Sequence, residues 1–293
     1  MVMEPECATK PAGPGGWPLG VNGRHILFTN YEGVDMQPGG TPGNSFENVG
    51  LRAMDLAGKG VIALPPYDPD NPKRLDNILA IHKLVSKWYA DMNVDVVISR
   101  PLSGDYLMSV VGGRQSDIVQ KAGVVGISPL DCSNRTEANL NYAFSGSLSE
   151  DPEQVAVTIA HEAGHAYGLV HTDNDKDIMF PSVQTPSDIG FATGEAADPG
   201  VCNVMQGYVQ DGKKILTENL GARPDNAKIA QGKQPAVVDA RSQTDFILQR
   251  TDSVMEMGYI KKKPGRDAID WTLLEAVIKE NPDLYGKLKF KSA

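Results

Sequence analysis

The sequence is organised around His161-Glu162-Ala163-Gly164-His165-Ala166-Tyr167-Gly168-Leu169-Val170-His171, which has the pattern H-E-x-x-H-x-x-G-x-x-H. Residues four apart share one face of an α-helix, so His161 and His165 can direct their imidazoles at one point. Gly168 permits an unusual turn out of the helix, after which His171 can return as a third ligand. Glu162 lies one step around the helix, where it can hold a water at the metal as a general base. The pattern predicts a zinc site whose fourth position stays open, which is typical of catalysis.

A second motif, Asp177-Ile178-Met179-Phe180-Pro181, follows the third histidine, with Met179 eight positions after His171. With these two motifs the sequence resembles the metzincin metallopeptidases, and most closely their matrixin branch. The resemblance implies that the three histidines are zinc ligands, that Glu162 is the general base, and that Met179 belongs to a turn beneath the metal. It covers about residues 24–190. The opposing interpretation, a buried helix with incidental histidines, is disfavoured because three of the five histidines in the chain lie in the motif.

Pro181 is a departure from the astacin- and serralysin-like metzincins, which place a tyrosine two residues after the methionine of this turn. That tyrosine can assist the transition state. The resemblance to matrixins implies that oxyanion stabilisation here rests on zinc and on backbone donors.

Composition limits the classes of function. The chain has 293 residues, 41% hydrophobic and 22% charged, which is ordinary for a soluble globular protein. A formal net charge of -9 argues against general nucleic-acid binding. No apolar run approaches the roughly 18 residues of a membrane span, and no signal peptide is visible. Peptidases of this type are usually exported, so we expect a secreted or cell-envelope protein in a processed form, and a monomer.

The three cysteines, Cys7, Cys132 and Cys202, leave one without a partner inside the chain. A disulfide between Cys132 and Cys202 is one option for an extracellular protein, and two free thiols are the other. Cys7 lies in an N-terminal extension, where some matrixins carry a cysteine that keeps the enzyme latent. Its surroundings do not match that switch, so a free thiol or a lipid-anchoring cysteine is favoured.

Three parts of the chain differ in character. Residues 1–23 are rich in proline and glycine, and this composition predicts a flexible arm. Residues 24–222 carry the motifs and form the predicted catalytic domain. Residues 223–293 form a helical extension of unknown role, with a helix at 265–280 and a weaker one at 239–257. The sequence of residues 185–237, which overlaps the start of this extension, predicts loops around one short helix.

The predicted fold class is α+β. Strands are expected at 25–30, 94–99, 106–111, 124–128 and 140–144, a loop at 39–43, and an amphipathic helix from the Asn71-Pro72 cap to about Asp91. Asp151 and Pro152 predict the start of the motif helix. The resemblance implies a twisted mixed sheet backed by two long helices. It also implies that an edge strand pairs with substrate, for which we choose 124–128, with Gly126 and Ile127; an ordinary internal strand is the alternative.

Two further features have ordinary explanations. His82 lies on the apolar face of the first helix and is expected to be a core histidine. The aspartates of residues 172–177 suggest calcium, but the glycine and glutamate of an EF-hand loop are missing, so a solvated loop is favoured. One of these carboxylates is instead a candidate hydrogen-bond partner of a ligand histidine.

The function predicted from the sequence is that of a zinc endopeptidase that cleaves proteins or peptides. Water activated by the metal would attack the peptide carbonyl, and Glu162 would take its proton and deliver it to the leaving amine. Two alternatives stay open. One is a binding or scaffold module, or a latent proenzyme, with a blocked cleft; the other is an exopeptidase.

Overall fold

The computed structural model describes residues 24–40, 43–51, 60–101, 105–118, 123–132, 134–136, 138–185, 187–223 and 271–280, with Lys262, Gly265 and Pro282. It divides into two compact units, residues 1–223 and 224–293. The predictions for the N-terminal arm, for Cys7 and for a helix at 239–257 lie outside the described residues. Within the described part of the chain, no helix has the length and apolar character needed to cross a membrane.

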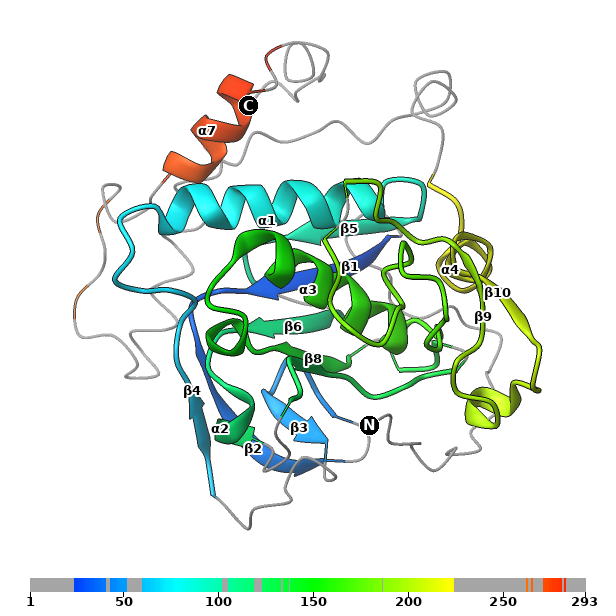
Figure 1. Ribbon diagram of the computed structural model, residues 1–293. Coiled ribbons are helices and arrows are strands. Elements are labelled where there is room, and N and C mark those ends of the chain that lie inside the picture. Colours follow the sequence, from blue (N-terminus) through cyan, green and yellow to red (C-terminus); the bar gives the residue numbers. More distant parts are fainter. Residues whose placement is uncertain are drawn as a thin grey trace. The chain divides into compact units, whose positions relative to one another are not determined.

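The first unit is built on a five-stranded sheet in the order β5-β1-β6-β8-β7 (Figure 1). These strands are β5 Val94–Val97, β1 His25–Asn30, β6 Leu107–Val111, β8 Leu140–Ala143 and β7 Gly126–Ile127. The first four are parallel neighbours, whereas β7 runs antiparallel to β8 and forms an edge of the sheet. The predicted α+β class with a mixed sheet is therefore confirmed. Four of the predicted strands, all except the first, are longer than those observed.

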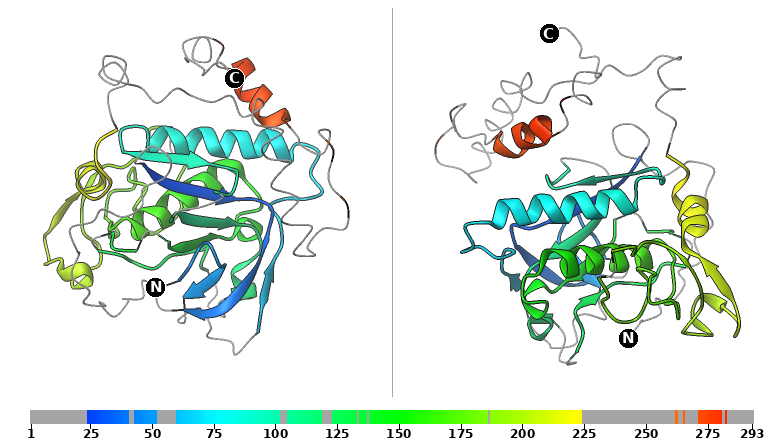
Figure 2. Two further views of the ribbon diagram at one scale, coloured as in Figure 1. Left: turned by 180° about the vertical axis from the view of Figure 1, so that it is seen from behind. Right: turned by 45° about the horizontal axis from the view of Figure 1, so that its top comes forward.

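Two 15-residue helices, α1 Arg74–Trp88 and α3 Pro152–Ala166, pack against each other and against one face of the sheet (Figures 1 and 2). The main core lies between them, where Ile81 and Val85 of α1 and Ile159 and Ala163 of α3 are fully buried. Apolar residues of β1, β6 and β8 complete this core from the sheet, because alternate side chains of a strand point to the same face.

The opposite face of the sheet is covered by a second, three-stranded sheet in the order β3-β2-β4. Its strands are β2 Val34–Gly40, β3 Val49–Leu51 and β4 Ile62–Leu64, and they lie on the side away from α1 (Figures 1 and 2). The prediction of a loop at 39–43 is wrong for Gly39 and Gly40, which belong to β2. The register of β2 against β3 shifts between Gln37 and Gly40, and such an irregularity admits Pro38, which has no N–H for the ladder.

The two long helices differ in how well their starts are predicted. Asp151 caps α3 as expected: its Oδ1 accepts a hydrogen bond from the N–H of Gln154 at 2.9 Å, and Pro152 is the first helical residue. The predicted cap of α1 is wrong, because the helix starts at Arg74 after Lys73. Asn71 instead closes a turn before the helix by accepting from Lys73 N at 2.8 Å.

The segment after the motif contains more regular structure than predicted. A hairpin of β9 Thr193–Glu195 and β10 Val209–Asp211 precedes α4 Gly212–Leu220.

Short helical segments lie at α2 Gln115–Ile118, Ser145–Ser147 and Val201–Asn203. In the second unit, α7 Thr272–Glu280 starts later than the predicted 265–280, because neither Gly265 nor Trp271 is helical.

Candidate metal centre

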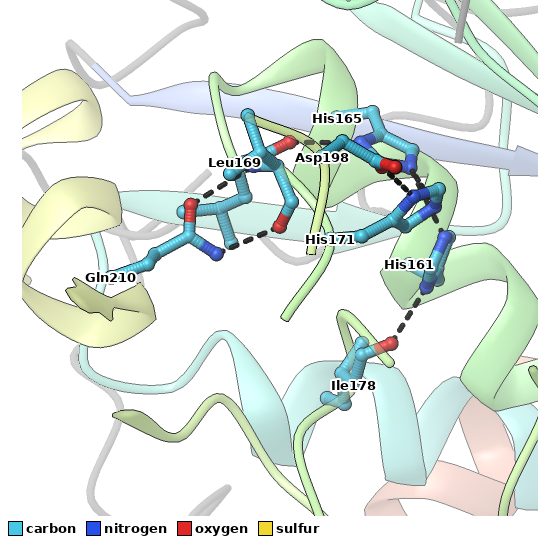
Figure 3. Close-up of polar contacts among 8 residues, drawn as sticks. His161, His165, Leu169, His171, Ile178, Asp198 and Gln210 are labelled. Atoms are coloured by element: carbon cyan, nitrogen blue, oxygen red, sulfur yellow. Dashed lines mark hydrogen bonds and ion pairs between the residues drawn. The ribbon is translucent and has the colours of Figure 1, made fainter. Parts of the chain in front are cut away.

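Helix α3 brings the first two motif histidines together. His161 and His165 lie in its last turns, and their Nε2 atoms are 3.1 Å apart. The Nε2 atom of His171 lies 3.2 Å from that of His165 (Figure 3). Ligands at the corners of a zinc tetrahedron with bonds of about 2.0–2.1 Å are separated by about 3.3–3.4 Å. Two of the three nitrogen pairs therefore have nearly the spacing that one zinc ion requires, and all three ligand atoms lie within 4.8 Å of one another.

The second nitrogen of each ring decides which atoms are free to bind a metal. His161 Nδ1 lies 2.7 Å from the backbone oxygen of Ile178, and His165 Nδ1 lies 2.8 Å from that of Leu169. A carbonyl oxygen can only accept, so Nδ1 carries the proton in both rings and Nε2 carries a lone pair. Adjacent lone pairs repel one another unless a cation lies between them. The donor set therefore fits a metal ion.

Burial keeps these two rings neutral. It lowers the pKa of His161 to about 4, assisted by the neighbouring His171, and it lowers the pKa of His165 well below its usual value. A neutral imidazole is the form that binds a metal. Among the described residues, His161, His165 and His171 make the one cluster of three or more side chains able to hold a metal ion. His82, partly buried on α1, is outside it.

Gly168 turns the chain out of α3 as predicted. Its φ of +102° is in the left-handed region, and a Cβ there would lie 2.7 Å from Nδ2 of Asn219. The N–H of Gly168 donates to the oxygen of His165 at 3.0 Å, and that of Leu169 donates to the oxygen of Gly164 at 2.9 Å. This pair of bonds is a Schellman motif. Asn219 of α4 adds a hydrogen bond to Tyr167 O at 2.7 Å, so that the turn is held from both sides.

Gln210 forms hydrogen bonds to the backbone of Val170, the residue that precedes His171. Its Oε1 accepts from Val170 N at 2.9 Å, and its Nε2 donates to Val170 O at 2.8 Å. Both residues are buried. One amide side chain therefore satisfies both backbone groups of Val170, and the backbone that carries His171 is fixed through them. Gln210 could not be predicted from the sequence, because a glutamine 40 residues from its partner gives no local signal.

The Nδ1 atom of His171 has a carboxylate partner, Asp198 Oδ2, at 2.5 Å. The alternative that a carboxylate of residues 172–177 holds one of these histidines is not realised, because the Nδ1 partners are Ile178 O, Leu169 O and Asp198. The buried carboxylate of that segment, Asp177, has a different role: it accepts from Thr172 Oγ1 at 2.8 Å, from Met179 N at 3.1 Å and from Ala192 N at 3.2 Å. It shapes the turn beneath the site, and burial raises its pKa.

Met179 lies in this turn and is fully buried. A Cβ on Gly164 would lie 2.6 Å from the sulfur of Met179, so the glycine allows the turn to approach the motif helix. Close approach of this kind is what glycine permits. Pro181, two residues further on, is exposed.

Glu162 lies against the edge strand β7. A Cβ on Gly126 would be 2.4 Å from Glu162 Oε1, which shows how closely the carboxylate approaches that strand. The side chain is buried, and burial raises its pKa to about 8 in the absence of a metal. Gly126 and Ile127 pair with Ala143 and Tyr142 on one side of β7, and among the described strands no partner lies on its other side.

Cys132 and Cys202 form a disulfide, so one of the two options left open by the sequence is realised. It joins the segment after β7 to the segment after Asp198, and the sequence separation is 70 residues.

Comparison with known proteins gives three similarities. The matrixin family model matches residues 120–197. The metalloendoproteinase 2-MMP of Arabidopsis thaliana is 27% identical over an alignment of 133 residues that covers 41% of this chain and 34% of the relative. The match thus spans about a third of that relative's length. The crystal structure of archaemetzincin from Methanopyrus kandleri has 12% identity and a TM-score of 0.34, and the match covers 67% of this chain and 95% of that one. The family match and the plant relative confirm the predicted resemblance to matrixin-like metzincins.

Proposed function

We propose that this protein is a zinc-dependent endopeptidase, with residues 24–222 as its catalytic domain. The observation that carries the proposal is the convergence of three Nε2 lone pairs next to a buried glutamate and an unpaired strand edge. His161, His165 and His171 would hold the zinc. Helices α1 and α3 against the mixed sheet also fit the metzincin-type domain that the sequence resembles.

Zinc held by these histidines would act as a Lewis acid toward the substrate carbonyl and would make a water acidic at neutral pH. Glu162 would accept a proton from the attacking water on its carboxylate and would then transfer it to the leaving amine nitrogen.

The edge strand β7 would bind the substrate in an extended form. An unpaired strand edge offers backbone N–H and C=O groups that recognise any extended peptide, largely independently of its side chains. Gly126 lies beside the glutamate carboxylate, so a peptide paired with β7 would have a backbone bond close to the reacting groups. This arrangement supports cleavage within a chain rather than removal of a terminal residue.

We also propose that the protein works outside the cytoplasm, in a secreted or cell-envelope form. The disulfide supports this location, because such bonds persist in oxidising compartments. Its substrates would be proteins or peptides.

The test is cleavage of a mixed peptide library by zinc-loaded wild-type protein, Glu162→Gln, His165→Ala and the control Glu195→Gln. Glu195 has the same chemistry as Glu162 but lies exposed on β9. We expect internal cleavage by the wild type and by the control. Glu162→Gln should retain zinc and lose about 10²–10⁴-fold in rate, whereas His165→Ala should lose zinc and activity together.

Two results would contradict the proposal. Zinc-loaded wild type that cuts no peptide is not an endopeptidase, and release of terminal residues alone would identify an exopeptidase. A Glu162→Gln protein that keeps its zinc and its full rate would remove the glutamate from the mechanism.

A further inference from the structure

The partner of His171 differs in kind from the partners of the other two ligands. His161 and His165 donate to backbone carbonyl oxygens, whereas His171 has a carboxylate oxygen at 2.5 Å (Figure 3). A hydrogen bond to a carboxylate is charge-assisted and stronger than one to a neutral carbonyl. His171 also lies outside the helix, on the chain that follows the Schellman turn, so its ring depends more on such a contact than the rings of α3 do.

The backbone on both sides of Asp198 is fixed. On one side, the N–H of Ala197 donates to the oxygen of His171 at 2.9 Å, which ties the two segments together at the ligand itself. On the other side the chain makes a tight turn, in which Gly200 N donates to Val204 O at 2.7 Å. Gly200 and Cys202 have positive φ in this turn. The carboxylate of Asp198 therefore reaches His171 from a closed loop, residues 197–204.

The disulfide holds this loop against the segment that supports the motif helix. Cys202 is bonded to Cys132, and the neighbouring Asp131 donates its N–H to the backbone oxygen of His165 at 3.1 Å. A small apolar cluster joins the same two segments at the chain before His171; it contains Leu130, Val170 and Ala196, with Val201, Cys202 and Val204 packed against it. The loop of residues 197–204, which carries Asp198, is thus connected to both His165 and His171.

We propose that Asp198 is a positioning residue for the third zinc ligand, and that the Cys132–Cys202 disulfide maintains zinc affinity by holding Asp198 on His171. The inference rests on the zinc site of the proposed function. A hydrogen bond from Nδ1 fixes the rotation of the ring and keeps the lone pair on Nε2. A carboxylate also makes the ligand nitrogen more basic, which strengthens its bond to a cation.

The first experiment measures the zinc dissociation constant by competition with a chromophoric chelator. Asp198→Ala should raise it about 10–100-fold, the usual effect of removing such a partner. Asp198→Asn keeps an acceptor oxygen but not the charge, so its increase should be smaller. Asp175→Ala is the matched control, because this exposed aspartate lies between His171 and Met179 and should leave the constant unchanged. Circular dichroism of the metal-free proteins checks that the fold is intact.

The second experiment tests the coupling to the disulfide by a double-mutant cycle. Replacing both cysteines (Cys132→Ala with Cys202→Ala) should raise the zinc dissociation constant in the wild-type background and change it little in the Asp198→Ala background. Additive effects would overturn the coupling. Loss of the fold in the cysteine variant would also overturn it, since the disulfide would then act on global stability.

Failure of this inference can be distinguished from failure of the proposed function. A wild-type protein that binds no zinc contradicts the function. A wild type that binds zinc and cleaves peptides, with an unchanged dissociation constant in Asp198→Ala, contradicts only the positioning role.

Discussion

Replacing Gln210 by alanine tests how the chain that carries His171 is held in place. The amide of Gln210 satisfies both the N–H and the C=O of Val170, and neither residue is more than 2% exposed. Gln210→Ala leaves both backbone groups buried without a partner. A buried group that loses its hydrogen bond costs about 1–3 kcal/mol, so we expect a loss of about 2–5 kcal/mol in the free energy of unfolding. Even the lower figure corresponds to a decrease in Tm of about 4–8 °C for a domain of this size.

The assay is denaturant unfolding of the metal-free protein in excess chelator, because bound zinc would add its own stabilisation. Gln210→Glu separates hydrogen bonding from packing. It keeps the size of the side chain and an acceptor for Val170 N, but a carboxylate has no donor for Val170 O. Gln206→Ala, at an exposed position four residues earlier, is the control. This role of Gln210 is contradicted if Gln210→Ala destabilises the protein no more than Gln206→Ala, or if Gln210→Glu is as stable as the wild type.

Two further predictions concern the motif helix. Gly164→Ala places a Cβ 2.6 Å from the Met179 sulfur and should lower the free energy of unfolding by about 1–3 kcal/mol. Gly190→Ala is the control, because its Cβ enters open space, and it should lower this free energy less. Equal effects of the two substitutions would argue against the contact between Gly164 and Met179. Glu162→Gln should stabilise the metal-free protein at pH 8 more than at pH 5. Burial raises the pKa of Glu162 in the folded protein from 4.5 to about 8. The contribution of this carboxyl group to the stability of the fold is therefore fully present below pH 4.5 and is lost as the pH rises through 8. Denaturant unfolding curves of both proteins at the two pH values measure the difference in stability. A stabilisation that does not depend on pH would contradict the raised pKa of the buried Glu162 carboxyl group.

The parts of the fold and site predicted correctly are those encoded by neighbouring residues. His161, Glu162 and His165 share a helix whose cap, Asp151, is readable from its own sequence. Gly168 has the left-handed conformation that the motif requires. The edge position of Gly126 and Ile127 was correct as well, although pairing with substrate stays a prediction. Periodicity and capping operate over a few residues, so one sequence suffices to detect them.

The parts that were missed depend on residues distant in the sequence. Asp198, Gln210 and Asn219 hold the chain around the third ligand from 27, 40 and 52 residues away. Their residue types are common in loops, and nothing in their local sequence distinguishes them from solvated side chains. The small sheet of β2, β3 and β4 was missed for a related reason, since Pro38 and two glycines in β2 resemble a loop until pairing with β3 is known.

The distant supports also set the order in which the site forms during synthesis. His161 and His165 lie on one helix, but the contacts that place the chain around His171 come from residues up to Asn219. A chain that ends before Ala197 therefore offers two imidazoles on one helix and a third that lacks the hydrogen bonds of Ala197, Asp198 and Gln210 to it and its neighbour. Two ligands bind zinc more weakly than three, so we expect a metal ion to bind only after residues 197–210 have folded onto the motif.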